Sequence, residues 1–259
     1  MQPNKLVFQN LKSSFLIIAI AQTVSERKLS IILDNPMLWI MNSLELIAFV
    51  VGLIYWGKFK NSTIKWFILF LGYNFFNEMA AAVFYVLEWV ADSNMIFYNF
   101  RYLIYFGLLF SLYYNKLESS KFRKAIIGLS VIWLFVYVYW LSVSNFWIQF
   151  ALVPGVLGGF FLMGIILFYF VESISQRSVK GIQNDFFTYL SLGLLLEAVV
   201  QLPVLITIHV GWAQITEYSD SRNDFFNTIK QVSFIASCIM YFVFMFGFYR
   251  SKRPEFRRA

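Results

Sequence analysis

Seven long apolar runs dominate the sequence and restrict the chain to a fold that lipid can surround. They cover Met37–Trp56, Trp66–Val90, Met95–Tyr114, Ala125–Leu141, Trp147–Phe170, Phe186–Gly211 and Phe226–Tyr249. Most of them approach or exceed the ~20 residues that an α-helix needs to cross the hydrocarbon layer of a bilayer. The period-two alternation of a membrane β-barrel is missing from these runs. We therefore predict an all-α, polytopic bundle of seven transmembrane helices.

The composition also favours a membrane protein. Of the 259 residues, 59% are hydrophobic and only 14% are charged, whereas soluble domains average ~25% charged residues. The 31 Phe, 15 Tyr and 8 Trp residues supply more apolar surface than one soluble core of this length can bury. Membrane lipid is therefore an expected partner of the chain.

Basic residues are distributed unevenly between the apolar runs. Fourteen Lys and Arg residues lie in the first, third and fifth connections and in the tail, while the second and fourth connections have none and the sixth has only Arg222. Because cytoplasmic loops carry the excess of Lys and Arg, we predict the N-terminus outside and the C-terminus in the cytoplasm. Arg27 and Lys28, before the first run, are the exception. The formal charge of +7 thus reflects membrane topology, and we expect no nucleic-acid partner.

A single membrane domain, residues 37–249, is flanked by two short segments. In residues 1–36, two lysines precede a short apolar run from Phe15 to Ala21. This pattern fits a cleaved signal peptide, a helix lying on the membrane surface, or a start codon placed too early. Residues 250–259 form a basic cytoplasmic tail that suits anionic lipid of the inner leaflet.

An arginine lies inside the third apolar run. Arg101 is about two turns from the start of that run, where an unpaired charge costs a few kcal/mol. We therefore expect it to be paired or to face a polar cavity. Four carboxylates in or at the edge of other runs could pair with it: Glu78 as first choice, Glu45 as second, and Glu88 and Glu197.

Further polar side chains share helix faces with these charges, at spacings of three, four or seven residues. With the predicted topology they collect in the outer half of the bundle, as expected for a cavity open to the outside and closed below. Lys230, near the outer end of the last run, supplies a second cation. The candidate ligand-binding residues are Glu45, Asn74, Glu78, Tyr98, Arg101, Tyr105, Glu197, Gln201 and Lys230.

Residue counts exclude several kinds of site. The chain has one histidine, His209, and one cysteine, Cys238, so a His- or Cys-rich metal site and an intrachain disulfide are excluded. We expect no metal and no cofactor. A retinal Schiff base on Lys230 is disfavoured, because that lysine lies close to a helix end and no carboxylate follows Arg101 and Tyr102 in the third run.

Three stretches of the sequence suggest a resemblance. They are the second run (YNFFNEMAAAVFY), the end of the third run (LFSLYYNKL) with its basic loop, and the end of the last run (FGFYRSKR). Over residues 66–253 the pattern resembles a group of small, uncharacterised bacterial seven-helix inner-membrane proteins. The resemblance implies a bacterial inner-membrane location and brings no activity or catalytic residue with it.

The pattern of buried charges favours a receptor-like or sensor-subunit binding protein that signals through a partner protein. Arg101 and Lys230 would hold an anionic group of a small polar or amphiphilic ligand, and the glutamates would hold a cationic group. One alternative is a proton- or cation-coupled carrier that uses Glu78 and Glu197. The others are an intramembrane lipid-modifying enzyme with a carboxylate as acid or base, and a structural charge cluster without a ligand.

Overall fold

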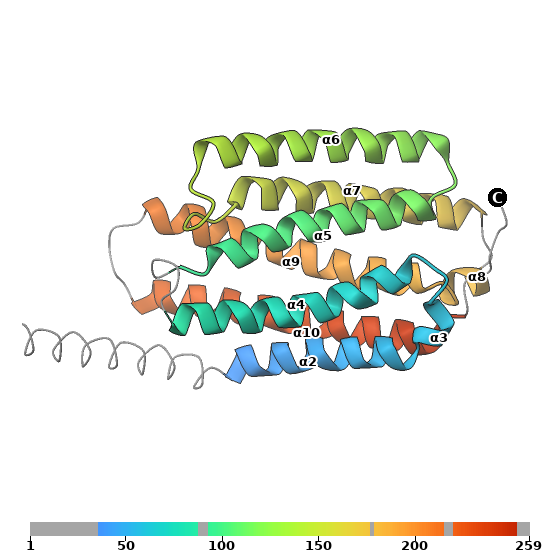
Figure 1. The fold of residues 1–259 in the computed structure, drawn as a ribbon, viewed down its shortest axis with the longest axis horizontal. Helices are drawn as coiled ribbons and strands as arrows, with labels where there is room; N and C mark the ends of the chain where they lie inside the picture. The colour runs from blue at the N-terminus through green and yellow to red at the C-terminus, as the bar shows by residue number, and fades with distance from the viewer. Residues whose placement is uncertain (1–35, 88–92, 177–178, 215–219, 253–259) are drawn as a thin grey trace, which may run out of the picture.

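The chain forms an all-α bundle in the computed structural model, which describes residues 36–87, 93–176, 179–214 and 220–252. The two flanking segments predicted from the sequence, residues 1–36 and 250–259, fall almost entirely outside these ranges. The helices, shown in Figure 1, are α2 (Pro36–Ile54), α3 (Trp56–Phe59), α4 (Ile64–Val86), α5 (Met95–Lys116), α6 (Ser120–Val143), α7 (Leu152–Gln176), α8 (Val179–Gln183), α9 (Phe186–Gln214) and α10 (Asp220–Arg250).

Within the described residues, seven helices are long and apolar enough to cross a membrane, which confirms the predicted number of spans. The shortest of them, α2, has 19 residues and is therefore about 29 Å long. That length is close to the thickness of the hydrocarbon layer. A helix satisfies its own backbone hydrogen bonds, which explains why apolar runs of this length adopt this conformation in lipid.

Six of the long helices form a closed ring. Following the ring, α2 packs against α4, α4 against α5, α5 against α7, α7 against α9, and α9 against α10, which returns to α2. The remaining long helix, α6, lies outside the ring on α5 and α7 (Figure 1). The ring encloses an interior toward which its helices turn one face.

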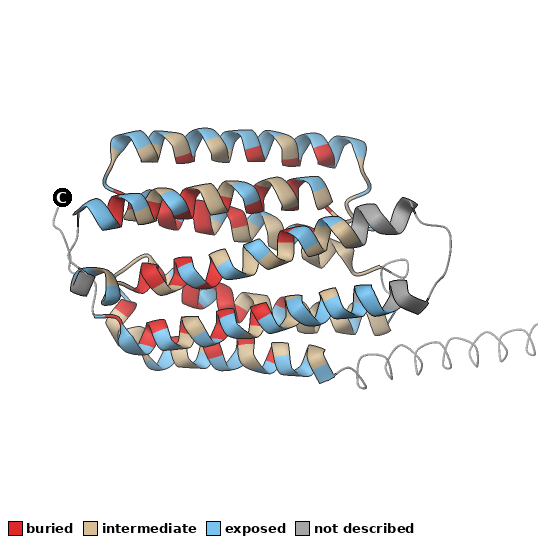
Figure 2. Ribbon diagram, turned by 180° about the vertical axis from the view of Figure 1, so that it is seen from behind, coloured by how far each residue is buried: buried red, intermediate tan, exposed pale blue. Residues whose placement is uncertain are grey.

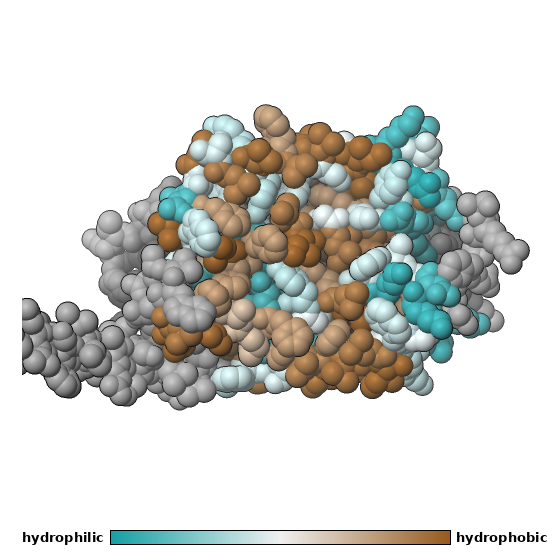
Figure 3. Space-filling view, viewed as in Figure 1, coloured by the Kyte–Doolittle hydropathy of each residue, from teal (hydrophilic) through white to brown (hydrophobic). Residues whose placement is uncertain are grey.

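The two ends of the bundle differ in charge. The connections through α3, between α5 and α6, and through α8 lie at the end where α10 finishes (Figure 1). We call this the basic end, because it carries Lys58, Lys60, Lys116, Lys121 and Arg250. At the opposite end, α4, α6 and α9 finish and α5, α7 and α10 begin. Between the ends, Figure 3 shows a mostly apolar surface.

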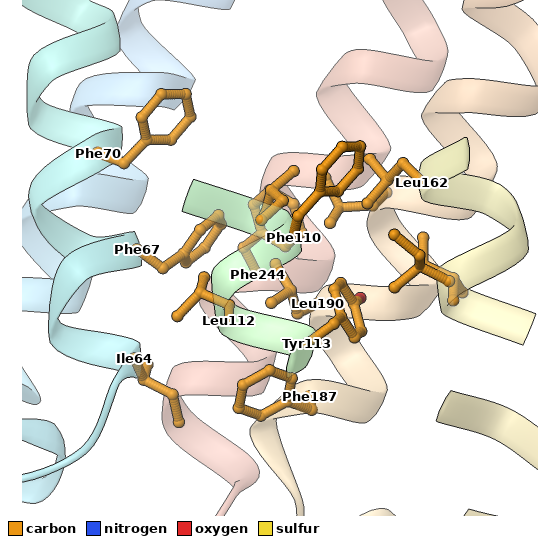
Figure 4. Packing of buried hydrophobic residues seen from close by; sticks show 14 of the residues in the cluster. Ile64, Phe67, Phe70, Phe110, Leu112, Tyr113, Leu162, Phe187, Leu190 and Phe244 are labelled. Atoms are coloured by element: carbon orange, nitrogen blue, oxygen red, sulfur yellow. The ribbon is translucent and has the colours of Figure 1, made fainter. Parts of the chain in front are cut away.

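Aromatic side chains fill the ring near the basic end. Phe186 of α9 stacks on Phe248 of α10 with ring centroids 4.6 Å apart, and Phe67 of α4 meets Phe244 edge-on at 5.1 Å. Phe59 of α3 lies 5.5 Å from Phe186. We refer to these five rings as the aromatic plug; none is more than 1% exposed. Buried residues concentrate in this half of the bundle (Figure 2), and Figure 4 shows Phe67 and Phe244 within the packed core.

Polar contacts fasten helix ends at the basic end. The Nζ of Lys58 donates to the carbonyl oxygen of Phe248 at 2.7 Å, where a cation is favourable beside the C-terminus of α10. Burial lowers the pKa of the Lys58 ammonium. At the start of α6, the backbone N–H groups of Glu118 and Ser119 donate to the Glu172 carboxylate at 2.7 and 2.9 Å. These bonds tie α10 to α3 and the start of α6 to α7.

At the opposite end, Asn99 of α5 holds the connection between α6 and α7. Its Nδ2 donates to the carbonyl oxygens of Phe146 and Gln149 at 2.8 and 2.7 Å. Its Oδ1 accepts the backbone N–H of Ala151 at 2.9 Å. The Asn99 side chain is fully buried, so this amide replaces water as the hydrogen-bond partner of the connection.

The predicted start of the fifth span was therefore too early. Helix α7 begins at Leu152 and not at Trp147, because the backbone groups before it bond to Asn99 instead of to a helical turn. Pro154 consequently falls in the first turn of α7, where a backbone N–H is not needed.

We predict that Asn99→Leu lowers the free energy of unfolding by roughly 3 kcal/mol, because three backbone groups lose their hydrogen-bond partner at about 1 kcal/mol each. The measurement is reversible unfolding in mixed micelles with increasing denaturing detergent. Asn115→Leu is the matched control, since Asn115 lies on the same helix and is exposed. Equal losses in the two variants would contradict the role of Asn99.

Candidate functional site

The ring encloses a cavity of about 420 Å³. Its wall comes from α4, α5, α7, α9 and α10, with Met41 of α2 and Phe150 of the connection before α7. Met41, Met95 and Phe150 lie near the end opposite the basic end, while Phe67 and Phe244 of the aromatic plug form the inner limit. The cavity therefore extends from the aromatic plug toward the end that lacks the basic connections.

An ion pair lies in the cavity wall between α4 and α5. The Arg101 guanidinium contacts the Glu78 carboxylate directly, which confirms Glu78 as its partner. The Tyr98 hydroxyl donates to the other oxygen of Glu78 at 3.2 Å, and its ring centroid lies 5.0 Å from Cζ of Arg101. The side chains of Arg101 and Glu78 retain 25% and 15% exposure. Figure 3 shows a hydrophilic patch over α4 and α5 within the apolar belt, so the bundle shields this region only partly.

Glu45, the second choice as partner of Arg101, has a different role. Its Oε1 accepts hydrogen bonds from Nδ2 of Asn74 and from the Tyr241 hydroxyl, both at 2.7 Å. The residue is 3% exposed and lies behind the cavity wall, where it joins α2 to α4 and α10. The Oδ1 of Asn74 is buried and has no hydrogen-bond partner in the described part of the chain. Glu45 is thus held by neutral donors, and one acceptor beside it finds no donor among those residues.

Glu197 of α9 lines the cavity one turn before Gln201. Gln201 donates through Nε2 to Oγ of Ser237 on α10 at 3.4 Å. Glu197, in contrast, makes no hydrogen bond or ion pair with any residue in the described part of the chain. Arg101 attracts it only at longer range. The cavity therefore holds one complete ion pair and one carboxylate whose partner the described residues do not supply.

Aromatic rings form much of the remaining wall. Phe70 and Tyr105 lie with ring centroids 5.7 Å apart, and Tyr102 lies 5.5 Å from Phe150. Tyr102 also reaches α7 at Gly155, where an added Cβ would lie 2.7 Å from the ring. A glycine at that position lets the tyrosine pack into the wall, so α5 and α7 approach closely beside the cavity.

The structure brings most of the candidate residues together. Those that line the cavity are Asn74, Glu78, Tyr98, Arg101, Tyr105, Glu197 and Gln201. Glu45 lies directly behind Asn74 and Tyr241. Glu88 lies outside the described residues.

Lys230 lies apart from these residues. The expectation that Arg101 and Lys230 together hold an anionic group of one ligand is therefore wrong. Lys230 is exposed and is not part of the cavity wall. Seven residues separate it from Ser237, so its Cα lies about 10 Å further along α10 than the nearest α10 residue of the wall. Arg101 is thus the one cation that lines the cavity among the described residues.

Two tyrosines of the site were missed from the sequence. Tyr241 binds Glu45, and Tyr102 lines the cavity. In an apolar helix a tyrosine is easily taken for core packing, and its hydroxyl gives no hydropathy signal. Tyr241 follows Ser237 by four residues, so both lie on one face of α10, and that spacing was the available signal.

The charges around the cavity do not balance. Glu45, Glu78 and Glu197 face a single guanidinium, that of Arg101, which leaves a formal excess of two negative charges when all are ionised. Such an excess is costly in a medium of low dielectric constant unless protons or a positive ligand remove it. Among the described residues, no group of three or more His, Cys, Asp or Glu side chains is placed to hold a metal ion.

The chain matches no protein family, no curated protein and no solved structure. The geometry of the cavity is therefore the basis for assigning a function.

We predict that removing Arg101 alone destabilises the bundle more than removing both charges of the ion pair. Arg101→Met leaves Glu78 unpaired and should cost roughly 3 kcal/mol of unfolding free energy. The double variant Arg101→Met/Glu78→Met should recover at least half of that loss, because no uncompensated carboxylate remains. A double-mutant cycle in the same unfolding assay measures the coupling, and simple additivity of the two single variants would contradict it.

Proposed function

We propose that the protein is a receptor-like binding protein of the membrane whose cavity takes up a small amphiphilic ligand. The observation that carries this proposal is the Glu197 carboxylate, which faces a cavity of about 420 Å³ without a partner among the described residues. Cavities that bind small molecules typically measure roughly 300–1,000 Å³. Aromatic rings beside an ion pair favour a ligand that has both an apolar body and a polar group.

In the proposed orientation, the basic end lies in the cytoplasm and the cavity opens toward the outside. The uneven distribution of Lys and Arg between the connections supports this orientation. It places the N-terminus outside and the basic tail, residues 250–259, beside the inner leaflet. A bacterial inner membrane is the proposed location, because the three resembling stretches of sequence are typical of such proteins.

The aromatic plug favours binding over transport. A carrier that used Glu78 and Glu197 would need a polar path from the cavity to the basic end. The five rings of the plug are no more than 1% exposed and pack against one another across α3, α4, α9 and α10. A charged solute would have to displace these rings. We therefore propose that no transport path connects the cavity to the basic end.

A signalling partner at the basic end completes the proposal. Helix α10 connects the two regions, because Ser237 and Tyr241 line the cavity while Phe248 accepts the hydrogen bond of Lys58. A ligand that shifts α10 would therefore change contacts at the cytoplasmic surface, where a partner protein can detect them.

We predict that filling the cavity removes a ligand that stays bound during mild detergent extraction. Ala198 lines the cavity, whereas its neighbour Val199 is 55% exposed on the outer face of the bundle. Native mass spectrometry should show a defined adduct on the wild type and on Val199→Leu, and none on Ala198→Leu. Melting temperatures establish that both variants are folded.

An adduct retained in full by Ala198→Leu would place the bound molecule outside the cavity. A wild-type protein without any defined adduct, or with only the same loosely held lipid as the variant, would contradict the proposed function and favour a structural charge cluster.

The proposed orientation predicts which loop positions a membrane-impermeant thiol reagent reaches in intact cells. In a Cys238→Ala background, Ser142→Cys at the end of α6 should be labelled, and Lys60→Cys at the basic end should be labelled only after the membrane is opened. Both positions are exposed. The reverse labelling pattern would overturn the orientation.

A further inference from the structure

Two hydrogen-bond acceptors at the cavity find no donor among the residues that the structure describes. One is the carboxylate of Glu197, and the other is the buried Oδ1 of Asn74. Arg101 and Tyr98 each donate to Glu78, on another part of the wall. A ligand that completes the site therefore has to bring donors of its own.

The charge of the site makes a positive donor more suitable than a neutral one. Arg101 is paired with Glu78, so Glu197, when ionised, has no direct counter-ion among the described residues. An ammonium group would supply both the donor and the counter-charge, and charge-assisted hydrogen bonds are about twice as strong as neutral ones. An anionic ligand would add a further negative charge beside Glu45, Glu78 and Glu197.

The wall fits an organic cation better than a metal ion. A metal ion needs several converging oxygen, nitrogen or sulfur ligands, and no group of three such acidic, His or Cys side chains is present among the described residues. The cavity instead presents the rings of Phe70, Tyr102, Tyr105 and Phe106. Aromatic faces attract organic ammonium groups, and they provide apolar surface for the remainder of the molecule.

On the premise of the binding function above, we propose that the ligand is an amphiphilic organic cation. Its ammonium group binds at Glu197, and its apolar body lies against the aromatic wall formed by α4 and α5. A free amine and the amino headgroup of a membrane lipid share this chemistry, and both satisfy the site.

The test compares three small probes of similar size in neutral maltoside micelles. Benzylammonium, the protonated form of benzylamine at neutral pH, is the cation, ethylbenzene is its uncharged isostere, and phenylacetate is an anion. The measurement is the rise of the melting temperature with probe concentration, from which the half-saturating concentration follows. The cation should stabilise the wild type at a concentration at least tenfold lower than the isostere does.

Variants at position 197 connect this preference to the carboxylate. Glu197→Gln should raise the half-saturating concentration of the cation at least tenfold and leave that of the isostere unchanged. Glu197→Asp should keep the preference for the cation. Glu118→Gln is the matched control, because Glu118 is exposed at the basic end and its replacement removes the same charge far from the cavity. It should bind all three probes as the wild type does.

The two sources of an ammonium group are separated by adding phosphatidylethanolamine to the micelles. Stabilisation by the lipid that is lost in Glu197→Gln identifies a lipid headgroup as the ligand. Stabilisation by benzylammonium alone identifies a free organic cation.

Three outcomes would overturn the proposed ligand class. They are equal stabilisation by the cation and its isostere, stabilisation by phenylacetate alone, and no stabilisation by any probe. The binding function would survive each of them if Ala198→Leu still removes the native adduct from the purified protein. A failure of the proposed ligand class can therefore be distinguished from a failure of the proposed binding function.

Discussion

The bundle depends on keeping Arg101 charged within apolar surroundings. A guanidinium does not lose its proton at any physiological pH, so α5 is stable in the membrane only where a carboxylate meets it. Glu78 of α4 fulfils that requirement, and the ring places α4 and α5 side by side. Glu45 and Glu197, the other two glutamates inside the bundle, therefore need partners other than Arg101. Glu45 obtains two neutral donors, whereas Glu197 obtains none from the described residues.

The same constraint divides the bundle along its length. In the basic-end half, the aromatic plug packs its rings in contact, and such pairs contribute about 0.5–1.5 kcal/mol beyond the area they bury. The half that contains Arg101 has a cavity and hydrogen-bonded tyrosines in place of that packing. A packed region at the basic end and a polar region toward the opposite end suit a site that a ligand enters from one side only. Helix α10 spans both regions and can carry the effect of binding from one to the other.

Much of the fold could be predicted from the sequence, because apolar length and the cost of a buried charge are local properties. Seven spans follow from them, and so does the need of Arg101 for a carboxylate partner. Which of the four candidate glutamates supplies it depends on the packing of α4 against α5. The start of α7 depends on Asn99, which lies about fifty residues away in the chain, and hydropathy carries no such information. The exclusion of Lys230 depends on how far α10 extends beyond its neighbours. The sequence does not predict whether Glu197 binds a ligand, because the ligand is a separate molecule.

The most direct measurement is an experimental structure, by electron cryo-microscopy, of the protein extracted gently from its native membrane. We predict non-protein density in the cavity, in contact with the Glu197 carboxylate and flanked by aromatic rings of α4 and α5. A cavity that is collapsed, or a Glu197 that is paired with another side chain of the chain itself, would contradict this prediction.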